Sequence, residues 1–229
     1  MTSRAIESRQ SGKAALSPPA NFNNLARIYC WLEWFTFGPF LSRCRSEFLS
    51  AINSQESALI IGDGDGRFTA RLLKQNSHIA VDALDASDAM LKELTRRTAP
   101  HAGRIRTLHL DAREYNPPSR HYDLIVTHFF LDCLTTQEMA RLASRLRGSV
   151  TEGALWVVSE FAVPETRYGM LVARFLVTAL YRAFGALTGL RVRQLPDHAA
   201  ELAKYGFRLL QRRERLGGLL VSELWQADK

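Results

Sequence analysis

The feature that most constrains this chain is a loop with glycine at every second position, Gly62, Gly64 and Gly66, directly after the apolar residues 58–61. A short apolar run with branched side chains is typical of a buried strand, and the sequence FTARLLKQ after the loop is typical of a helix. Glycine has no Cβ and tolerates positive φ, so a ligand can approach such a loop closely. The segment predicts a strand, a cofactor-binding loop and a helix; a glycine-rich turn without a ligand is the alternative.

The residues between the glycines indicate the charge of the cofactor. Asp63 and Asp65 would face a pyrophosphate at a cost of roughly 1 kcal/mol per charge pair in water and about 4 kcal/mol at intermediate dielectric. The dinucleotide fingerprint also requires glycine where this chain has Arg67, and the Lys-Ser/Thr pair of a P-loop is missing. An acidic loop instead suits S-adenosylmethionine (SAM), which carries a sulfonium and an ammonium group.

The rest of the chain alternates strand-like and helix-like segments. We expect further strands at 78–85, 104–112, 122–131 and 154–161, and helices at 87–98, opened by a Ser87 cap, and at 136–148. Residues 207–215 and 219–227 are two β-like runs separated only by Leu216-Gly217-Gly218, which forces an antiparallel pair. The prediction is an α/β fold with a doubly wound, mostly parallel seven-stranded sheet and an antiparallel C-terminal hairpin, whose ligand crevice lies beyond the carboxyl ends of the strands.

The length of 229 residues suits one domain. We expect a disordered leader at 1–20 and a domain at 21–229 that includes an N-terminal helical cap at 21–52 and a helical insertion at 164–200. Arg174 and Arg182 interrupt the apolar insertion, so it is not expected to cross a membrane.

Charge and cysteine content exclude little by themselves. The formal net charge is +7, with the excess in the last third of the chain, which favours either an anionic partner or an ordinary solvated face. Cys30, Cys44 and Cys133 are odd in number and lack C-x-x-C spacing, so neither a disulfide framework nor a metal site is indicated. Together with an N-terminus that lacks an apolar secretion segment, this favours a cytoplasmic protein.

Acidic residues at the ends of the second and third predicted strands have the positions that a nucleoside would require. Asp85 lies 19 positions beyond Gly66, where a carboxylate can accept hydrogen bonds from both ribose hydroxyls. A role beside the cap of the next helix is the alternative. Asp111 and Ala112 end the third strand and are placed to meet the adenine.

The sequences IIGDGDG, VDALDASDAML, LHLDA and YDLIVTHFFL, followed by a terminal hairpin, resemble the successive motifs of class I SAM-dependent methyltransferases over about residues 58–163 and the tail. The resemblance implies a Rossmann-like methyltransferase fold with SAM as cofactor. It assigns the methionine part of SAM to Gly62, Gly64 and Gly66, the ribose to Asp85 and the adenine amine to Asp111. The other residues expected to line the cofactor are Asp63, Ala86, Met90, Ala112 and Thr127.

The chain departs from the family at one position. Family members usually have an acid two residues before the first glycine, which binds the loop and the SAM amino group, and this chain has Ile60. Asp63 or Asp65 could substitute; otherwise SAM would bind weakly.

Methyl transfer from a sulfonium is an in-line displacement, so few side chains are obligatory beyond those that align the acceptor and remove its proton. His128 and Asp132 are the candidate catalytic residues, four apart and able to share a helical face if the chain turns there. Cofactor lining or packing is the alternative for His128. Asp197, after Pro196, is interpreted as a helix cap, and Asn116-Pro117-Pro118 as a turn, because it precedes the fourth strand.

The expected function is methylation of a small, lipophilic or aromatic molecule, because insertions of this kind roof the acceptor pocket in the quinone-pathway methyltransferases that this arrangement loosely resembles. Packing on the sheet edge or a homodimer partner is the alternative for the insertion. Its flanking arginines would also suit peripheral contact with an anionic membrane. A SAM-binding module without catalysis and a nucleic-acid methyltransferase are the competing functions, although nucleic acid is not the expected partner. The acceptor atom (O, C or N) is left open.

Overall fold

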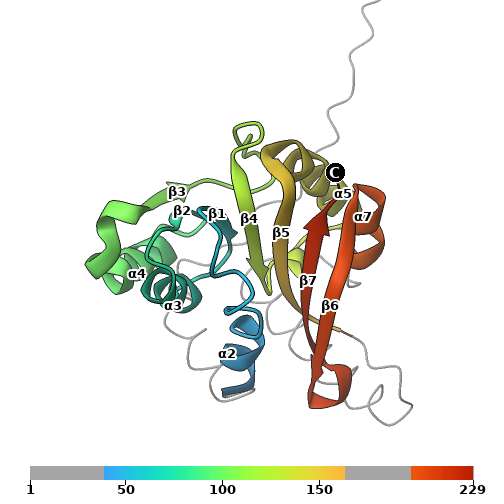
Figure 1. The fold of residues 1–229 in the computed structure, drawn as a ribbon, viewed down its shortest axis with the longest axis horizontal. Coiled ribbons are helices and arrows are strands. Elements are labelled where there is room, and N and C mark those ends of the chain that lie inside the picture. Colours follow the sequence, from blue (N-terminus) through green and yellow to red (C-terminus); the bar gives the residue numbers. More distant parts are fainter. Residues whose placement is uncertain (1–38, 163–196, 229) are drawn as a thin grey trace, which may run out of the picture.

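The computed structural model describes residues 39–162 and 197–228; the expected leader and most of the predicted cap and insertion lie outside these ranges. Seven strands form one sheet in the order β3-β2-β1-β4-β5-β7-β6 (Figure 1). The strands are β1 (Ser57–Ile61), β2 (Ala80–Asp85), β3 (Ile105–His109), β4 (Tyr122–His128), β5 (Val150–Phe161), β6 (Phe207–Arg215) and β7 (Leu220–Ala227). Strands β1 to β5 pair in parallel, whereas β7 is antiparallel to both β5 and β6. The predicted fold class, including the C-terminal hairpin, is confirmed.

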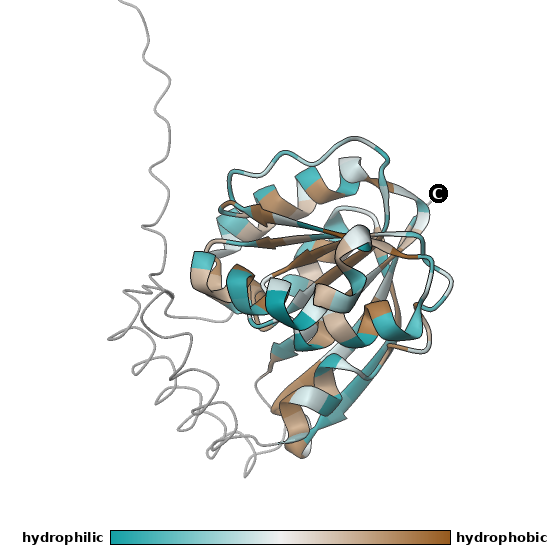
Figure 2. Ribbon diagram, turned by 90° about the vertical axis from the view of Figure 1, so that its left-hand side faces the viewer, coloured by the Kyte–Doolittle hydropathy of each residue, from teal (hydrophilic) through white to brown (hydrophobic). Residues whose placement is uncertain are grey.

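Helices cover both faces of the sheet (Figure 2). Helices α3 (Arg67–Gln75) and α4 (Asp88–Thr98) pack together on one face, and α5 (Thr136–Ser149) and α7 (His198–Lys204) on the other. The remaining helical segments described are α2 (Pro39–Arg45) and the short 3-10 turns η1 (Ala99–Arg104), η2 (Leu131–Cys133) and η3 (Leu216–Gly218). No helix in the described ranges is long and apolar enough to cross a membrane.

Side chains along β1 point alternately to the two faces of the sheet, so this strand contributes to both hydrophobic clusters. Leu59 and Ile61 belong to the cluster under α5, whereas Ala58 and Ile60 belong to the cluster under α3. All four residues are at most 1% exposed. A strand buried on both faces must be apolar throughout, which is why residues 58–61 form an unbroken apolar run.

Side-chain caps fix where the helices begin. The Ser87 hydroxyl accepts a hydrogen bond from the Met90 N–H, and the Asp197 carboxylate accepts one from the Ala200 N–H. Thr135 and Glu138 form a reciprocal capping box at the start of α5. The predicted cap roles of Ser87 and Asp197 are confirmed.

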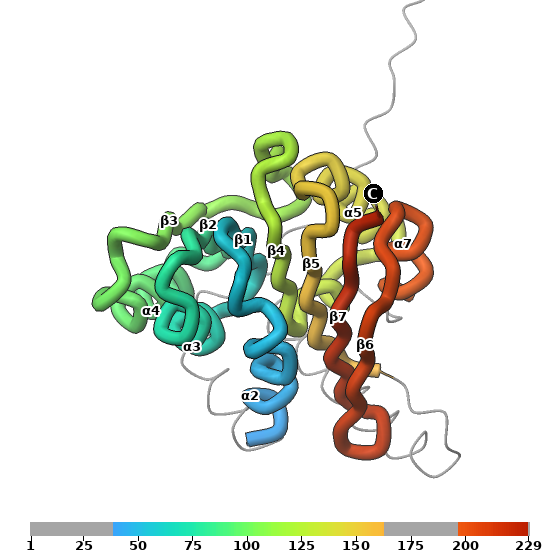
Figure 3. Tube along the Cα trace, in the orientation of Figure 1, coloured from blue at the N-terminus to red at the C-terminus, as the bar shows by residue number. Residues whose placement is uncertain are grey.

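Helix α2 lies at the same edge of the sheet as the carboxyl ends of β4 and β5 (Figure 3). The backbone oxygen of Cys44 accepts hydrogen bonds from the hydroxyls of Ser159 on β5 and Ser222 on β7. The chain leaves the described part after β5 at this edge, and it enters the described part at α2. This edge therefore brings together the glycine loop, the turn after β4 and both connections to the residues outside the described ranges.

Candidate functional site

The glycine loop runs from β1 to α3 with a backbone that other residues could not adopt easily. Gly62, Gly64 and Gly66 have φ values of 73°, 62° and 77°. A Cβ on Gly66 would lie 2.7 Å from Cγ and 2.9 Å from Cα of Leu94. Glycine is therefore required at this position both for the left-handed backbone and for the close approach of α4. The loop has the positive-φ backbone that the glycine spacing predicted, and its role in binding a cofactor stays a prediction.

Asp63 is buried inside this loop. Its Oδ2 accepts hydrogen bonds from the backbone N–H and the hydroxyl of Thr69, at 2.9 and 2.7 Å, which caps the first turn of α3. Its Oδ1 is buried and has no hydrogen-bond partner. Burial raises the pKa of the Asp63 carboxyl, against the bonds from Thr69 and the charge of Arg45. Oδ2 of Asp63 therefore stabilises the first turn of α3, and Oδ1 is left without a hydrogen-bond partner.

Asp65 has a different role from Asp63. Its carboxylate forms salt bridges with Arg67 and Arg97, each at 2.9 Å, and its backbone oxygen accepts a further bond from Arg97. These two guanidinium groups balance its charge. Of the two loop aspartates, Asp63 is the one with an uncommitted buried oxygen.

Asp85 ends β2 beside the loop, as expected. Its carboxylate accepts hydrogen bonds from the backbone N–H groups of Ser87, at 2.8 Å, and Gly64. Burial raises its pKa to about 6, and the nearby charge of Asp63 contributes in the same direction. Two acids with raised pKa values at one loop, Asp63 buried and Asp85 partly buried, favour a cationic ligand, because a positive charge would stabilise both carboxylates.

The other predicted cofactor residues lie at the ends of β2 and β3. Ala86 is exposed, and the Met90 sulfur is 3.7 Å from where a Cβ on Gly64 would be. Asp111 accepts several hydrogen bonds from Arg113, which outweigh the effect of burial and lower its pKa. Ala112 is buried, and its carbonyl accepts a bond from Arg145. A carboxylate retains lone pairs beyond a guanidinium contact, so adenine recognition by Asp111 stays a prediction.

Thr127 and His128 end β4 on opposite faces. The Thr127 hydroxyl is fully buried and accepts a hydrogen bond from the Trp156 indole at 3.0 Å. The His128 ring packs edge-on against Phe68 with 4.5 Å between ring centroids, and both its ring nitrogens are buried without a hydrogen-bond partner. Burial lowers the pKa of His128 well below its ordinary value, so the ring is neutral. This geometry favours packing for both residues, and their predicted functional roles stay predictions.

The expectation that His128 and Asp132 share a helical face is wrong. His128 belongs to the strand, Phe129 has a φ of 52°, and Asp132 lies in the short turn η2. Because β4 continues through His128 and the chain then turns sharply, no helical turn connects the two residues. Asp132 is 8% exposed and lies close to Glu160 at the end of β5.

Sequence analysis did not assign a function to Glu160. Its carboxyl accepts hydrogen bonds from the backbone N–H groups of Phe130 and Leu131, at 3.0 and 2.8 Å. The signal in the sequence is an acid near the end of the mostly apolar strand sequence ALWVVSEF. The structure adds this buried acid to the edge that already holds Asp63, Asp85 and Asp132.

Ile60 stands where the resemblance leads us to expect an acid. It is 1% exposed and packs in the cluster on the α3 side of the sheet. Residue 60 is therefore an apolar core residue in this chain, whereas the resemblance leads us to expect an acid at this position.

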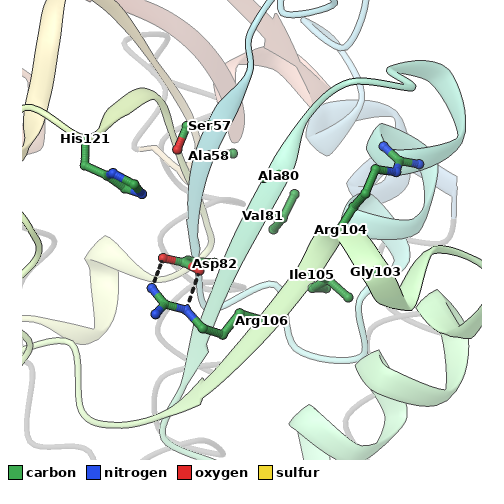
Figure 4. Close-up of a pocket in the computed structure, with 10 residues that line it drawn as sticks. All are labelled: Ser57, Ala58, Ala80, Val81, Asp82, Gly103, Arg104, Ile105, Arg106 and His121. Carbon is green, nitrogen blue, oxygen red and sulfur yellow. Dashed lines mark hydrogen bonds and ion pairs between the residues drawn. The ribbon is translucent and has the colours of Figure 1, made fainter.

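A cavity of about 220 Å³ lies where strands β1, β2 and β3 begin, at the end of the sheet opposite to the glycine loop (Figure 4). It is lined by the first residues of β1, β2 and β3, and by Asp82 and Arg106, which are joined by two hydrogen bonds. In a parallel sheet the ligand crevice lies beyond the carboxyl ends of the strands. This cavity is consequently separate from the glycine loop.

Comparison with known proteins identifies the same region. A family model described as a methyltransferase domain matches residues 59–156, a range that contains the glycine loop, Asp85, Asp111 and β4. The malonyl-[acyl-carrier protein] O-methyltransferase of Paenibacillus sp. (strain JDR-2) is 29% identical over an alignment of 160 residues, which covers 67% of this chain and 56% of that protein. This chain therefore spans little more than half the length of that relative.

Solved structures share the fold. The N-methyltransferase NodS from Bradyrhizobium japonicum WM9, in complex with S-adenosyl-L-homocysteine (SAH), matches 82% of this chain and 88% of its own with a TM-score of 0.62 and 15% identity. The mitomycin 7-O-methyltransferase MmcR matches 90% of this chain and 60% of its own with a TM-score of 0.64 and 17% identity. At these identities the likeness establishes the fold.

Proposed function

We propose that this chain is a class I SAM-dependent methyltransferase and that it transfers the methyl group of SAM to a small lipophilic or aromatic acceptor. The observation that carries the proposal is the buried, unpaired Oδ1 of Asp63 within the glycine loop. An unpaired buried oxygen is rare in folded proteins and calls for a partner. A ligand with a cationic group is the partner that this oxygen fits.

The residues of the loop fit SAM in shape as well as in charge. Gly62 and Gly64 have no side chain to cover the loop backbone and adopt positive φ values without strain, and Asp85 presents a carboxylate beside the loop. SAM supplies an electrophilic methyl group on a sulfonium. The chain's own residues bind and orient the cofactor, exclude water from it and align the acceptor.

Asp63 provides the acid that is missing at Ile60. Its Oδ2 holds α3 through Thr69, and its Oδ1 is available to a cofactor ammonium. One carboxylate would then connect the loop and the cofactor, as the family acid does. A charged hydrogen bond in a buried site contributes more than a neutral one, so this contact supports SAM affinity.

In this proposal the acceptor lies beside two aromatic rings, one of which, Phe129, also has the Arg45 guanidinium 5.3 Å from its centroid. Phe129, after β4, and Phe161, at the end of β5, are partly exposed and pack together with 5.0 Å between ring centroids. The sequence that continues from Phe161, residues 164–190, is also mostly apolar. Aromatic rings suit an apolar acceptor, which they would desolvate without unpaired polar groups.

Removal of the acceptor proton, where the acceptor has one, falls to Asp132 in this proposal. Asp132 lies in the turn after β4, next to Phe130, whereas the ring nitrogens of His128 are buried against Phe68. The proton would pass from the acceptor atom to the Asp132 carboxylate while that atom forms its bond to the methyl group and the methyl–sulfur bond breaks. His128 then lines the site.

The expected surface contacts are also part of the proposal. An anionic membrane would be recognised by arginines such as Arg167 and Arg174, and a homodimer could form along the exposed edge strand β6, which carries Leu209 and Leu210. Flotation that does not depend on anionic lipid would count against the membrane contact. A sedimentation mass of one chain across micromolar concentrations would count against the dimer.

One pair of experiments separates this proposal from its competitors. Calorimetry should detect SAM binding, and tritium from labelled SAM should then appear in a small molecule from a cell lysate. If the protein does not bind SAM at millimolar concentration, the proposal is refuted. Binding without transfer would favour a SAM-binding module, and label in RNA would favour a nucleic-acid methyltransferase.

A further inference from the structure

The Glu160 carboxyl is 1% exposed at the end of β5. Its Oε1 accepts the N–H groups of Phe130 and Leu131, whereas its Oε2 is buried and has no hydrogen-bond partner. These two N–H groups belong to the sharp turn that follows β4, in which Phe129 has a φ of 52°. A residue other than glycine with positive φ is strained by about 1 to 3 kcal/mol, so surrounding contacts must hold it in place. Glu160 provides two of those contacts.

The same turn contacts the cofactor loop. A Cβ placed on Gly62 would come within 3.0 Å of the Phe130 Cβ and 3.1 Å of its ring. Phe130 therefore lies directly against the first glycine of the loop. A shift of this turn would change the shape of the loop, because packed interiors transmit displacement.

We propose that Glu160 is a positioning residue of the cofactor site, which holds the turn after β4 so that Phe130 supports Gly62 and the glycine loop in their binding shape. The inference rests on the proposed function in taking SAM as the ligand. Glu160 acts through Phe130 and not by touching the reacting atoms. Since Phe161 follows it directly, Glu160 also connects the acceptor side of the site to the cofactor side.

The charge of Glu160 decides which substitution should preserve its role. Burial raises its pKa well above the ordinary value, and the nearby charge of Asp132 raises it further, against the bonds from the backbone N–H groups of Leu131, Phe130 and Asp132. A neutral carboxyl and a glutamine amide have the same shape and each retains an oxygen that accepts N–H bonds. Glu160→Gln should therefore preserve the contact, and Glu160→Ala should remove it.

The test is calorimetric titration of SAM and SAH into the wild type, Glu160→Gln and Glu160→Ala. Loss of an acceptor shared by two buried N–H groups should lower the affinity of the alanine variant for both ligands at least about tenfold, and the glutamine variant should stay within about threefold of wild type. Asp82→Ala is the matched control, because Asp82 is a buried acid that accepts bonds from Arg106 and Tyr122 and lines the cavity at the opposite end of the sheet. It should lower the free energy of unfolding without lowering SAM affinity.

Two further measurements apply if Glu160→Ala does not fold. Phe130→Ala leaves the acceptor oxygen in place and should also weaken SAM binding. In Glu160→Gln, the amide hydrogens of Phe130 and Leu131 should exchange as slowly as in the wild type. Wild-type affinity in a folded Glu160→Ala, or in Phe130→Ala, would overturn this inference alone. A wild-type protein that does not bind SAM would overturn the proposed function together with it.

Discussion

Asp63 and Thr69 are joined by two hydrogen bonds that both end on one carboxylate oxygen: the Thr69 N–H and hydroxyl donate to Oδ2 at 2.9 and 2.7 Å. The other oxygen, Oδ1, is buried beside them without a partner. The structural role of Asp63 in α3 thus involves only Oδ2. Its Oδ1 is therefore the atom at which cofactor recognition can be tested most directly.

We expect Asp63→Asn to lower SAM affinity by about 1 to 3 kcal/mol, since it removes the charge that would pair with a cofactor cation. The amide oxygen can still accept the Thr69 bonds, so the free energy of unfolding should change little. Calorimetry with SAM and SAH locates the contact, because SAH keeps the ammonium but lacks the sulfonium charge. An equal loss for both ligands indicates the ammonium.

Asp88→Asn is the control for that comparison. Asp88 pairs with Lys92 on α4 and its side chain is 51% exposed, so it carries the same charge in a solvated position. Its substitution should leave SAM affinity unchanged. If the two variants lose the same affinity, the effect is the net charge of the protein and not a contact of Asp63.

The pH dependence of SAM binding should follow Asp85. Burial raises its pKa to about 6, and only the carboxylate form accepts hydrogen bonds from both ribose hydroxyls. Affinity should therefore fall as the pH drops below about 6, by up to about tenfold per pH unit. Calorimetry from about pH 5 to about pH 8 measures this, and Asp85→Asn should flatten the profile. A profile that Asp85→Asn leaves intact would refute the assignment.

The same pKa shift has the opposite consequence for stability without ligand. The folded state binds more protons at Asp85 than the unfolded state between about pH 4 and about pH 6, so the contribution of Asp85 falls as the pH rises through that window. Urea unfolding of the ligand-free protein should show this loss. In Asp85→Asn it should disappear.

Gly66→Ala should destabilise the protein by about 2 to 4 kcal/mol, the sum of an unfavourable positive φ and a collision with Leu94. Gly217→Ala in the hairpin turn is the matched control, because Gly217 also has a positive φ, 65°, but no atom lies within 4 Å of its added Cβ. It should cost about 1 kcal/mol. Chemical denaturation compares the two, and equal losses would mean that the contact with α4 contributes nothing.

The proposed roles of Asp132 and His128 predict different kinetics. Asp132→Asn should lower kcat about 100-fold with little change in SAM affinity, as expected for loss of a general base. His128→Phe keeps an aromatic ring against Phe68 and should change kcat by less than about fivefold. Tritium transfer to the identified acceptor measures both. The reverse order would make His128 the base.

Local sequence patterns predicted most of the fold because they reflect local physics. The apolar run before Gly62 is typical of a strand buried on both faces, and the spacing of the glycines favours a loop that approaches its neighbours closely. Ser87 and Asp197 cap their helices through bonds to residues three positions away. Asp85 reaches the loop because parallel strands end at one edge.

The sequence could not predict how the acids at that edge are paired. Asp63 and Asp65 look alike in the loop, but only the fold brings Arg97 to Asp65 and leaves one oxygen of Asp63 unpaired. The same holds for Glu160, whose partners lie 29 and 30 positions earlier in the chain.

The sequence of this protein by itself determined its strand order along the chain, its glycine loop and its helix caps, since these depend on residues close together in the chain. The tertiary structure decided which buried polar atoms are satisfied and which are free to meet a ligand. The reason is physical: hydrophobic periodicity and glycine spacing act over a few residues, whereas hydrogen-bond pairing in a core depends on side chains that only packing brings within about 3 Å.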